Sequence, residues 1–241
     1  MQTTNLNLLI PDKRDVERDA VAKSFEQYGG KVHRIGRFWD PPTFDASTVR
    51  VYGPDAFCLV LQQKLGLRLC SPSDDLMLQV PPQFLNRQLA SASLAEISAG
   101  TFPKFIKPLT PKQFRAAIYE SSGALATECR GLPDNTTVFA SERVTISAEA
   151  RTFVLDGVVL DAAVYEGAAE ITGPQQLVEA LARCIPLPRT VVVDVGFIEG
   201  RGWAVIEFNA SWGAGLNGCD ADKVLPAILA ASEPITDLHQ V

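Results

Sequence analysis

Two apolar runs near the carboxyl end of the chain are separated by a short polar segment. Residues 190–198 and 203–209 are rich in β-branched and aromatic side chains, and residues 199–202, with two glycines, have the composition of a turn. This pattern predicts an antiparallel β-hairpin.

The hairpin brings three polar side chains together. If Ile198 pairs with Trp203, then Asp194 lies directly opposite Glu207, and both point to the same side of the sheet. Asn209 is two residues beyond Glu207 and joins that side. A slip of one residue would place Asp194 and Glu207 on opposite faces, so the prediction depends on the register.

Opposed carboxylates in an apolar hairpin require a physical explanation, because like charges directly opposite each other destabilise a sheet. One explanation is a bound cation, and oxygen-only ligands favour Mg²⁺ or Mn²⁺. The alternative is a solvated hairpin face that carries ordinary polar residues. The apolar residues that flank Asp194 and Glu207 favour the metal site.

Periodicity in the first part of the chain predicts a small α/β unit. Strands are expected at residues 5–11, 31–35 and 48–52, and helices at 14–28 and 54–65, each followed by glycine.

Further along, residues 83–99 have a helical pattern, and we place a domain boundary near residue 95, which gives domains 1–95 and 96–241. The second domain is expected to be rich in strands, and the tail from Ser232 is expected to be loosely held. The expected strands are 104–107, 136–141, 147–155 and 158–165 besides the hairpin, and the expected helices are 174–184 and 216–231.

A second hairpin is predicted by the turn signal Asp156-Gly157. Its expected register places Arg151 opposite Ala162 and Glu149 opposite Val164, so Glu149 and Arg151 share one face. They form either a structural ion pair or a site that presents Arg151 to a phosphate or a carboxylate, since a guanidinium binds either anion bidentately.

Composition narrows the function classes. The 241 residues are 46% hydrophobic and carry a net charge of -6, with a pI near 5.0, which disfavours a nucleic-acid-binding surface. Five cysteines without C-x-x-C spacing and two distant histidines disfavour zinc and disulfide frameworks. Because the N-terminus lacks a basic region before an apolar one and no apolar run is long enough to span a bilayer, we expect a cytoplasmic protein.

The order of these motifs resembles that of the ATP-grasp superfamily, and it looks closest to a small, mostly uncharacterised clade. The resemblance covers roughly residues 100–225 and implies an α+β (α/β) ATP-grasp fold with a small N-terminal α/β pre-grasp domain. The residues that carry it are Phe105-Ile106-Lys107-Pro108, Ser141-Glu142-Arg143-Val144, Glu149-Ala150-Arg151, Asp194 and Glu207-Phe208-Asn209.

The resemblance implies a role for each motif. Lys107 would bind the ATP phosphates, the segment from Ser141 to Val144 (Ser141, Glu142, Arg143 and Val144) would hold adenine and ribose, and Glu149 would lie near the nucleotide. Asp194, Glu207 and Asn209 would hold Mg²⁺ or Mn²⁺. Without the other motifs, Lys107 would be interpreted as a surface lysine.

The chain departs from the family pattern in two places. Many ATP-grasp ligases carry an arginine two residues before the metal-binding aspartate, where this chain has Val192, and the loop after Lys107 has no glycine-rich phosphate cradle. Arg151, Lys112 or Arg189 would have to supply the missing charge. Lys112 is also consistent with a plain solvated residue.

The function that the resemblance implies is an ATP- and Mg-dependent carboxylate-amine ligase that acts through an acyl-phosphate on an amino acid, a peptide or a protein terminus. A phosphotransferase, a non-catalytic nucleotide-binding module and a purely structural hairpin protein are alternatives. The expected partners are ATP and a small-molecule or peptide substrate, with a homodimer left open and with neither nucleic acid nor membrane.

Overall fold

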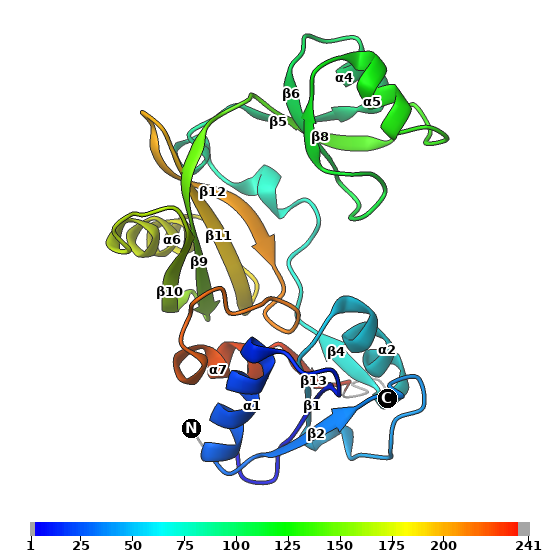
Figure 1. Ribbon diagram of the computed structural model, residues 1–241, viewed down its shortest axis with the longest axis vertical. Helices are drawn as coiled ribbons and strands as arrows, with labels where there is room; N and C mark the ends of the chain where they lie inside the picture. Colours follow the sequence, from blue (N-terminus) through cyan, green and yellow to red (C-terminus); the bar gives the residue numbers. More distant parts are fainter. Residues whose placement is uncertain (1–2, 236–241) are drawn as a thin grey trace, which may run out of the picture.

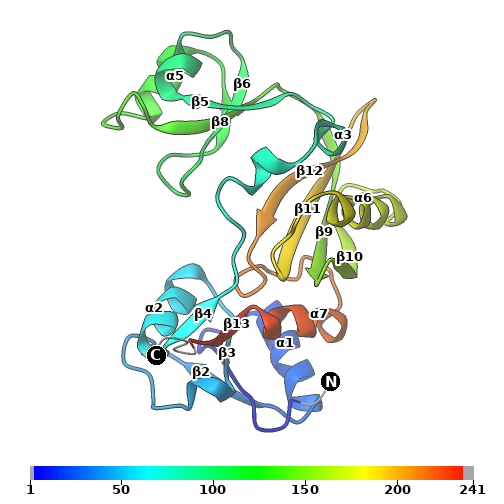
Figure 2. The same cartoon turned by 180° about the vertical axis from the view of Figure 1, so that it is seen from behind.

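The computed structural model describes residues 3–235. Figures 1 and 2 show an N-terminal unit at one end, a four-stranded sheet in the middle and a small lobe at the other end. The C-terminal helix returns to the N-terminal unit.

The N-terminal unit is a parallel sheet with flanking helices, as its sequence pattern predicts. Its strands lie in the order β2-β1-β3. Asp15 caps the first helix by accepting a hydrogen bond from the Arg18 N–H, and Gly66 ends the second in the left-handed region at φ 64°. The elements are β1 (Asn7–Pro11), α1 (Val16–Gln27), β2 (Lys31–Ile35), β3 (Val49–Val51) and α2 (Asp55–Leu65), with a 3₁₀ turn at Ala46–Thr48.

The small lobe is an antiparallel sheet in the order β5-β8-β6-β7 with two short helices on one face. Ile106 and Val138 face these helices, whereas Lys107 and Phe139, the next residues along, face the middle sheet. The elements are β5 (Leu89–Ser93), α4 (Leu94–Ser98), β6 (Lys104–Pro108), β7 (Ala117–Tyr119), α5 (Ser122–Glu128) and β8 (Thr137–Ser141).

The prediction of one helix over residues 83–99 is wrong. A short helix, α3 (Pro82–Leu85), ends where Asn86 adopts a left-handed conformation at φ 47°, and the 3₁₀ turn Leu76–Gln79 precedes it. Strand β5 follows and pairs with β8. Pairing with a distant strand therefore overrides the helical preference of the alanines in this segment.

The middle sheet is antiparallel, in the order β10-β9-β11-β12, and its central strands are buried on both faces. Helix α6 covers one face, and the other face packs partly against α7, which itself packs against α1 of the N-terminal unit. The elements are β9 (Ile146–Leu155), β10 (Val158–Glu166), α6 (Thr172–Cys184), β11 (Thr190–Ile198), β12 (Gly202–Asn209) and α7 (Ala221–Ala230).

Asp194 does lie opposite Glu207, but the register near the turn differs from the expected one. Ile198 pairs with Gly202 instead of Trp203. A β-bulge then leaves Ile206 without a partner, which shifts the register by one residue and restores the predicted pair.

The β9–β10 hairpin is out of register with its prediction. It begins as expected, with Leu155 opposite Val158, but a bulge then places Arg151 opposite Ala163 instead of Ala162. A second bulge places Glu149 opposite Glu166 instead of Val164. Glu149 and Arg151 still share a face, because Tyr165 donates a hydrogen bond to Glu149 and its ring lies 5.9 Å from the Arg151 guanidinium.

Two expectations at the C-terminal end are corrected. The last helix begins at Ala221, not at 216, because Asn217 and Gly218 both have positive φ and form a turn before the Asp220 cap. The tail is also held further than expected, since β13 (Ser232–Pro234) pairs with β4 (Leu67–Leu69) and Ser232 is buried. Residues 236–241 lie outside the described part of the chain.

The domain boundary near residue 95 stays a prediction. None of the helices within residues 3–235 is long and apolar enough to cross a bilayer.

Candidate active site

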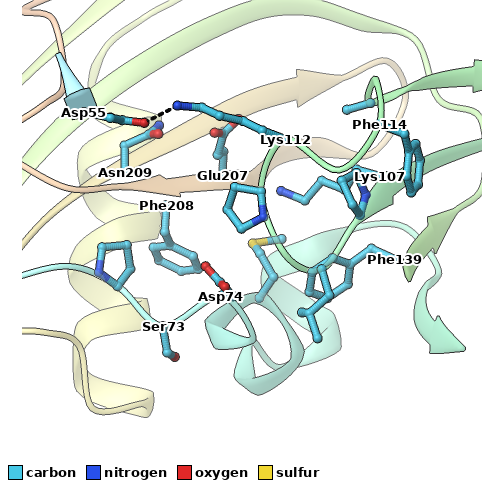
Figure 3. A pocket seen from close by; sticks show the side chains of 16 residues that line it. Asp55, Ser73, Asp74, Lys107, Lys112, Phe114, Phe139, Glu207, Phe208 and Asn209 are labelled. Atoms are coloured by element: carbon cyan, nitrogen blue, oxygen red, sulfur yellow. Dashed lines mark hydrogen bonds and ion pairs between the residues drawn. The ribbon is translucent and has the colours of Figure 1, made fainter. Parts of the chain in front are cut away.

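A pocket of about 410 Å³ lies between the small lobe and the middle sheet (Figure 3). Lys107 and Lys112 reach it from the small lobe, and Glu207 and Asn209 reach it from β12. Asp55, the first residue of α2, closes one side. The structure thus brings four of the predicted site residues to one pocket from two parts of the chain.

A narrower apolar pocket adjoins the first. Phe105 and Phe139 line it from the small lobe, and Ile206 lines it from β12. Lys107 and Glu207 line both pockets, so the two form one cleft with an apolar end and a charged end. Such a shape suits a ligand with a flat apolar part and a negatively charged part.

Lys107 lies at the junction of the two pockets. Its position opposite Phe139 in the β6–β8 pairing places its ammonium 5.7 Å from the centre of the Phe139 ring. Its positive charge also lowers the pKa of Glu207, which shows that the two side chains face each other across the cleft.

Glu207 is exposed to the pocket, yet its pKa is raised above the ordinary value. Desolvation by the surrounding protein is the largest cause, and it outweighs the opposing effect of Lys107; the neighbouring Asp194 charge raises the pKa further. Among residues 3–235, no hydrogen-bond donor contacts the Glu207 carboxylate. Its oxygens are therefore available to a ligand from the cleft.

Asp194 is the one charged residue within the buried strand β11, and Arg151 compensates it. The Arg151 Nε donates to Oδ1 at 2.8 Å and its Nη2 donates to Oδ2 at 2.7 Å. Asn209 Nδ2 donates to the same Oδ2 at 2.9 Å. Burial alone would lower the Arg151 pKa, but the hydrogen bonds to Asp194 raise it, so the guanidinium stays charged.

The donor set fits a hard divalent cation. Asp194, Glu207 and Asn209 offer only oxygen atoms to a metal, and Mg²⁺ commonly binds one or two carboxylates while water and substrate phosphates complete its shell. Three hydrogen bonds already occupy Asp194. In residues 3–235 no group of three His, Cys, Asp or Glu side chains converges. Glu207 is therefore the open ligand of the set, and Asp194 would share its carboxylate with Arg151.

Lys112 enters the pocket from the loop between β6 and β7 and forms an ion pair with Asp55. Both side chains are more than half exposed, so this pair is worth little energetically. A phosphate could compete for Lys112 with little loss of stability.

The segment after β8 is divided between the cleft and the surface. Ser141 lines the apolar pocket. The Glu142 carboxylate instead accepts hydrogen bonds from Arg201 at the tip of the β11–β12 hairpin and from the Gln88 N–H. Arg143 is exposed and lies 3.7 Å from Glu120, and neither it nor Val144 lines the two pockets.

Sequence analysis missed the apolar end of the cleft. Phe139 alternates with Val138 and Ala140 along β8, so a two-residue period could have placed it on the Lys107 face. No local signal identifies Met77 or Asp55 as pocket residues, because both reach the cleft only through tertiary packing.

Comparisons with known proteins agree with this geometry. A family model described as an ATP-grasp domain, family 2 of its clade, matches residues 84–227. None of the curated protein sequences matches the chain significantly.

Solved structures share the fold at low sequence identity. A RimK domain ATP-grasp protein from Sphaerobacter thermophilus has a TM-score of 0.60 and 14% identity, with 93% of this chain and 99% of that chain covered. The D-cycloserine synthetase DcsG has a TM-score of 0.60 and 16% identity over the same shares of the two chains. The ATP-grasp ligase PsnB, complexed with its minimal precursor, Mg and ADP, has a TM-score of 0.55 and 14% identity, with 94% and 98% covered.

Proposed function

The chain belongs to this ATP-grasp domain family, and on this basis we propose that it is an ATP- and Mg-dependent ligase that joins a carboxylate to an amine. The observation that carries the proposal is the two-ended cleft. Its apolar end, between Phe105, Phe139 and Ile206, suits a purine, and its charged end, with Lys107 and Lys112, suits a triphosphate.

The proposed reaction has two steps. A substrate carboxylate oxygen attacks the γ-phosphorus of ATP, the bond from the γ-phosphorus to the bridging oxygen breaks, and ADP leaves. An amine nitrogen then attacks the acyl carbon of the acyl-phosphate, the C–N bond forms, phosphate departs and the nitrogen loses a proton. Neither step needs a protein nucleophile, so positioning and charge neutralisation are the main contributions of the chain.

Each predicted site residue has a role in this proposal. Lys107 and Lys112 bind phosphate oxygens as point charges, and Glu149 orients Tyr165 beside Arg151. Glu207, Asn209 and Asp194 would hold Mg²⁺, which, when bound, neutralises charge on the triphosphate. The segment from Ser141 to Val144 would meet the nucleoside by its backbone.

Arg151 is our candidate for the charge that many ATP-grasp ligases place two residues before the metal-binding aspartate. Val192 occupies that position and is fully buried. Arg151 lies beside Asp194 on the neighbouring strand, so its guanidinium reaches the same region from β9.

We propose an amino acid, a peptide or a protein terminus as the substrate. PsnB, which shares the fold, has been captured with a precursor peptide and AMPPNP, and another similar structure is an L-amino acid ligase from Bacillus licheniformis. These names support a substrate class and select no individual acid or amine.

ADP release tests the proposal. The purified protein with Mg²⁺ and ATP is screened against pairs of carboxylates and amines, including peptides, and each pair is compared with the acid alone and the amine alone. A ligase releases ADP and forms the amide only when both are present.

A phosphotransferase is the second candidate, favoured by the absence of an arginine at position 192. It releases ADP with a single acceptor and yields a stable phosphorylated product. Binding of Mg-ATP without ADP release under any pair would instead indicate a nucleotide-binding module, and the ligase proposal would then fail.

A further inference from the structure

The loop that follows β12, residues 210–219, is held by the N-terminal unit. The Tyr52 hydroxyl donates a hydrogen bond of 2.8 Å to the carbonyl of Ala214. The Gly53 N–H donates one of 3.0 Å to the carbonyl of Trp212. The loop begins directly after Asn209, so its position bears on the candidate active site.

The strongest of these contacts involves Glu17, in the first turn of α1. Its Oε2 accepts the Leu216 N–H at 3.0 Å, and its Oε1 accepts the Asn217 N–H at 2.7 Å. One carboxylate therefore satisfies two successive backbone donors that lie 199 and 200 residues further along the chain. Hydrogen bonds to an ionised acceptor are stronger than neutral ones.

The peptide unit between Gly215 and Leu216 connects Glu17 to the active site. Its N–H binds Glu17, and its carbonyl oxygen accepts a hydrogen bond of 2.9 Å from the Arg151 Nη1. Because a peptide unit is planar and rigid, the contact on one side fixes the direction of the carbonyl on the other. The other edge of the Arg151 guanidinium binds both oxygens of Asp194.

We infer that Glu17 is a positioning residue for Arg151, and through it for Asp194. The guanidinium has two anchors, the Asp194 carboxylate and the Gly215 carbonyl, and Glu17 fixes the second of them. Without Glu17, the peptide unit can rotate and Arg151 loses the anchor that sets its orientation. The effect on nucleotide binding rests on the proposed function, whereas the effect on Arg151 does not.

Gly215 gives a second observation for the same arrangement. A Cβ atom built at this position would lie 2.5 Å from the Glu17 Oε2, too close for the carboxylate to stay in place. A glycine is therefore needed here for the close approach of Glu17. Gly215→Ala should displace the Glu17 carboxylate and act in the same direction as removal of Glu17.

The test compares Glu17→Ala and Glu17→Gln with Glu26→Ala, a change at an exposed position of the same helix. The first readout, in the protein without nucleotide, is the NMR signal and hydrogen exchange of the Arg151 Nε–H group, assigned by its loss in Arg151→Lys. We expect faster exchange in Glu17→Ala, a smaller change in Glu17→Gln, which keeps one acceptor, and none in Glu26→Ala. An unchanged Arg151 signal in folded Glu17→Ala would overturn the inference.

The second readout is the affinity for Mg-ATP by calorimetry. We expect about tenfold weaker binding in Glu17→Ala, the loss that corresponds to one charge-assisted hydrogen bond. The same change should have a much smaller effect in an Arg151→Ala background, since the effect acts through Arg151. An equal effect in both backgrounds would contradict the inference. If the wild-type protein binds no Mg-ATP, the proposed function fails, and the Arg151 signal still decides on the role of Glu17.

Discussion

Arg151 on β9 lies directly opposite Asp194 on β11, and its guanidinium binds both carboxylate oxygens at 2.8 and 2.7 Å. Only 11% of the Arg151 side chain and 6% of the Asp194 side chain are exposed. In such a buried pair, each charge depends on the other for compensation, because neither can be solvated by water. The pair therefore links the stability of the sheet to the geometry of the active site.

The first prediction concerns this pair. Arg151→Ala leaves the Asp194 charge buried without its main partner, and we expect a loss of about 3 kcal/mol in the free energy of unfolding, measured by denaturant titration without metal. Arg189→Ala is the matched control, because its partner Asp156 is 3.5 Å away and both are exposed. The control should change stability by less than about 0.5 kcal/mol. Equal losses in the two variants would contradict the assignment of a buried pair.

The second prediction concerns Glu207. Glu207→Gln removes the open carboxylate of the donor set, so we expect the magnesium-dependent part of ATP binding to be lost, as measured by calorimetry with and without Mg²⁺. Stability should not fall, because the raised pKa of Glu207 shows that its charge is disfavoured in the folded protein.

Asp74→Asn is the control for Glu207→Gln, since Asp74 lines the same pocket and loses the same charge. It should leave the magnesium dependence intact. If Glu207→Gln keeps the wild-type response to Mg²⁺, then Glu207 is no metal ligand and the donor set must be reconsidered.

The third prediction separates a phosphate-binding role of Lys107 from a structural one. Lys107→Ala should weaken ATP binding about ten- to hundredfold, the cost of a lost charge-assisted contact. Lys104→Ala, on the same strand but outside the cleft pockets, should leave the affinity unchanged. A large drop in melting temperature together with normal ATP affinity would show that Lys107 is structural.

The sequence could predict much of the site because the polar residues lie in strongly patterned strands. The opposition of Asp194 and Glu207 was nevertheless reached through an incorrect pairing near the turn, which the bulge at Ile206 compensates. Bulges leave little local signal, so the β9–β10 register, where two bulges occur, could not be predicted in the same way.

The error at residues 83–99 has a different cause. Ser93 and Glu96 form a capping box, which marks the start of a new helix and was a readable signal against one continuous helix. The strand before it has no such signal, because β5 depends on its pairing with β8, almost 50 residues further along. The apolar end of the cleft likewise depends on long-range packing and could not be read from local pattern.

The last prediction concerns the contact between the small lobe and the hairpin tip. Hydrogen bonding by Arg201, and then by the Gln88 N–H, lowers the pKa of Glu142 below its ordinary value of 4.5. The unfolded chain therefore binds this proton more readily than the folded one, so the contribution of Glu142 to stability is present at neutral pH and is lost as the pH falls through the lowered pKa. Glu142→Gln should lower the melting temperature at about pH 7 and have little effect below about pH 4. Glu199→Gln, an exposed change at the same hairpin turn, serves as the control. A difference between wild type and Glu142→Gln that persists unchanged at acid pH would show that the Glu142 charge contributes nothing to this contact.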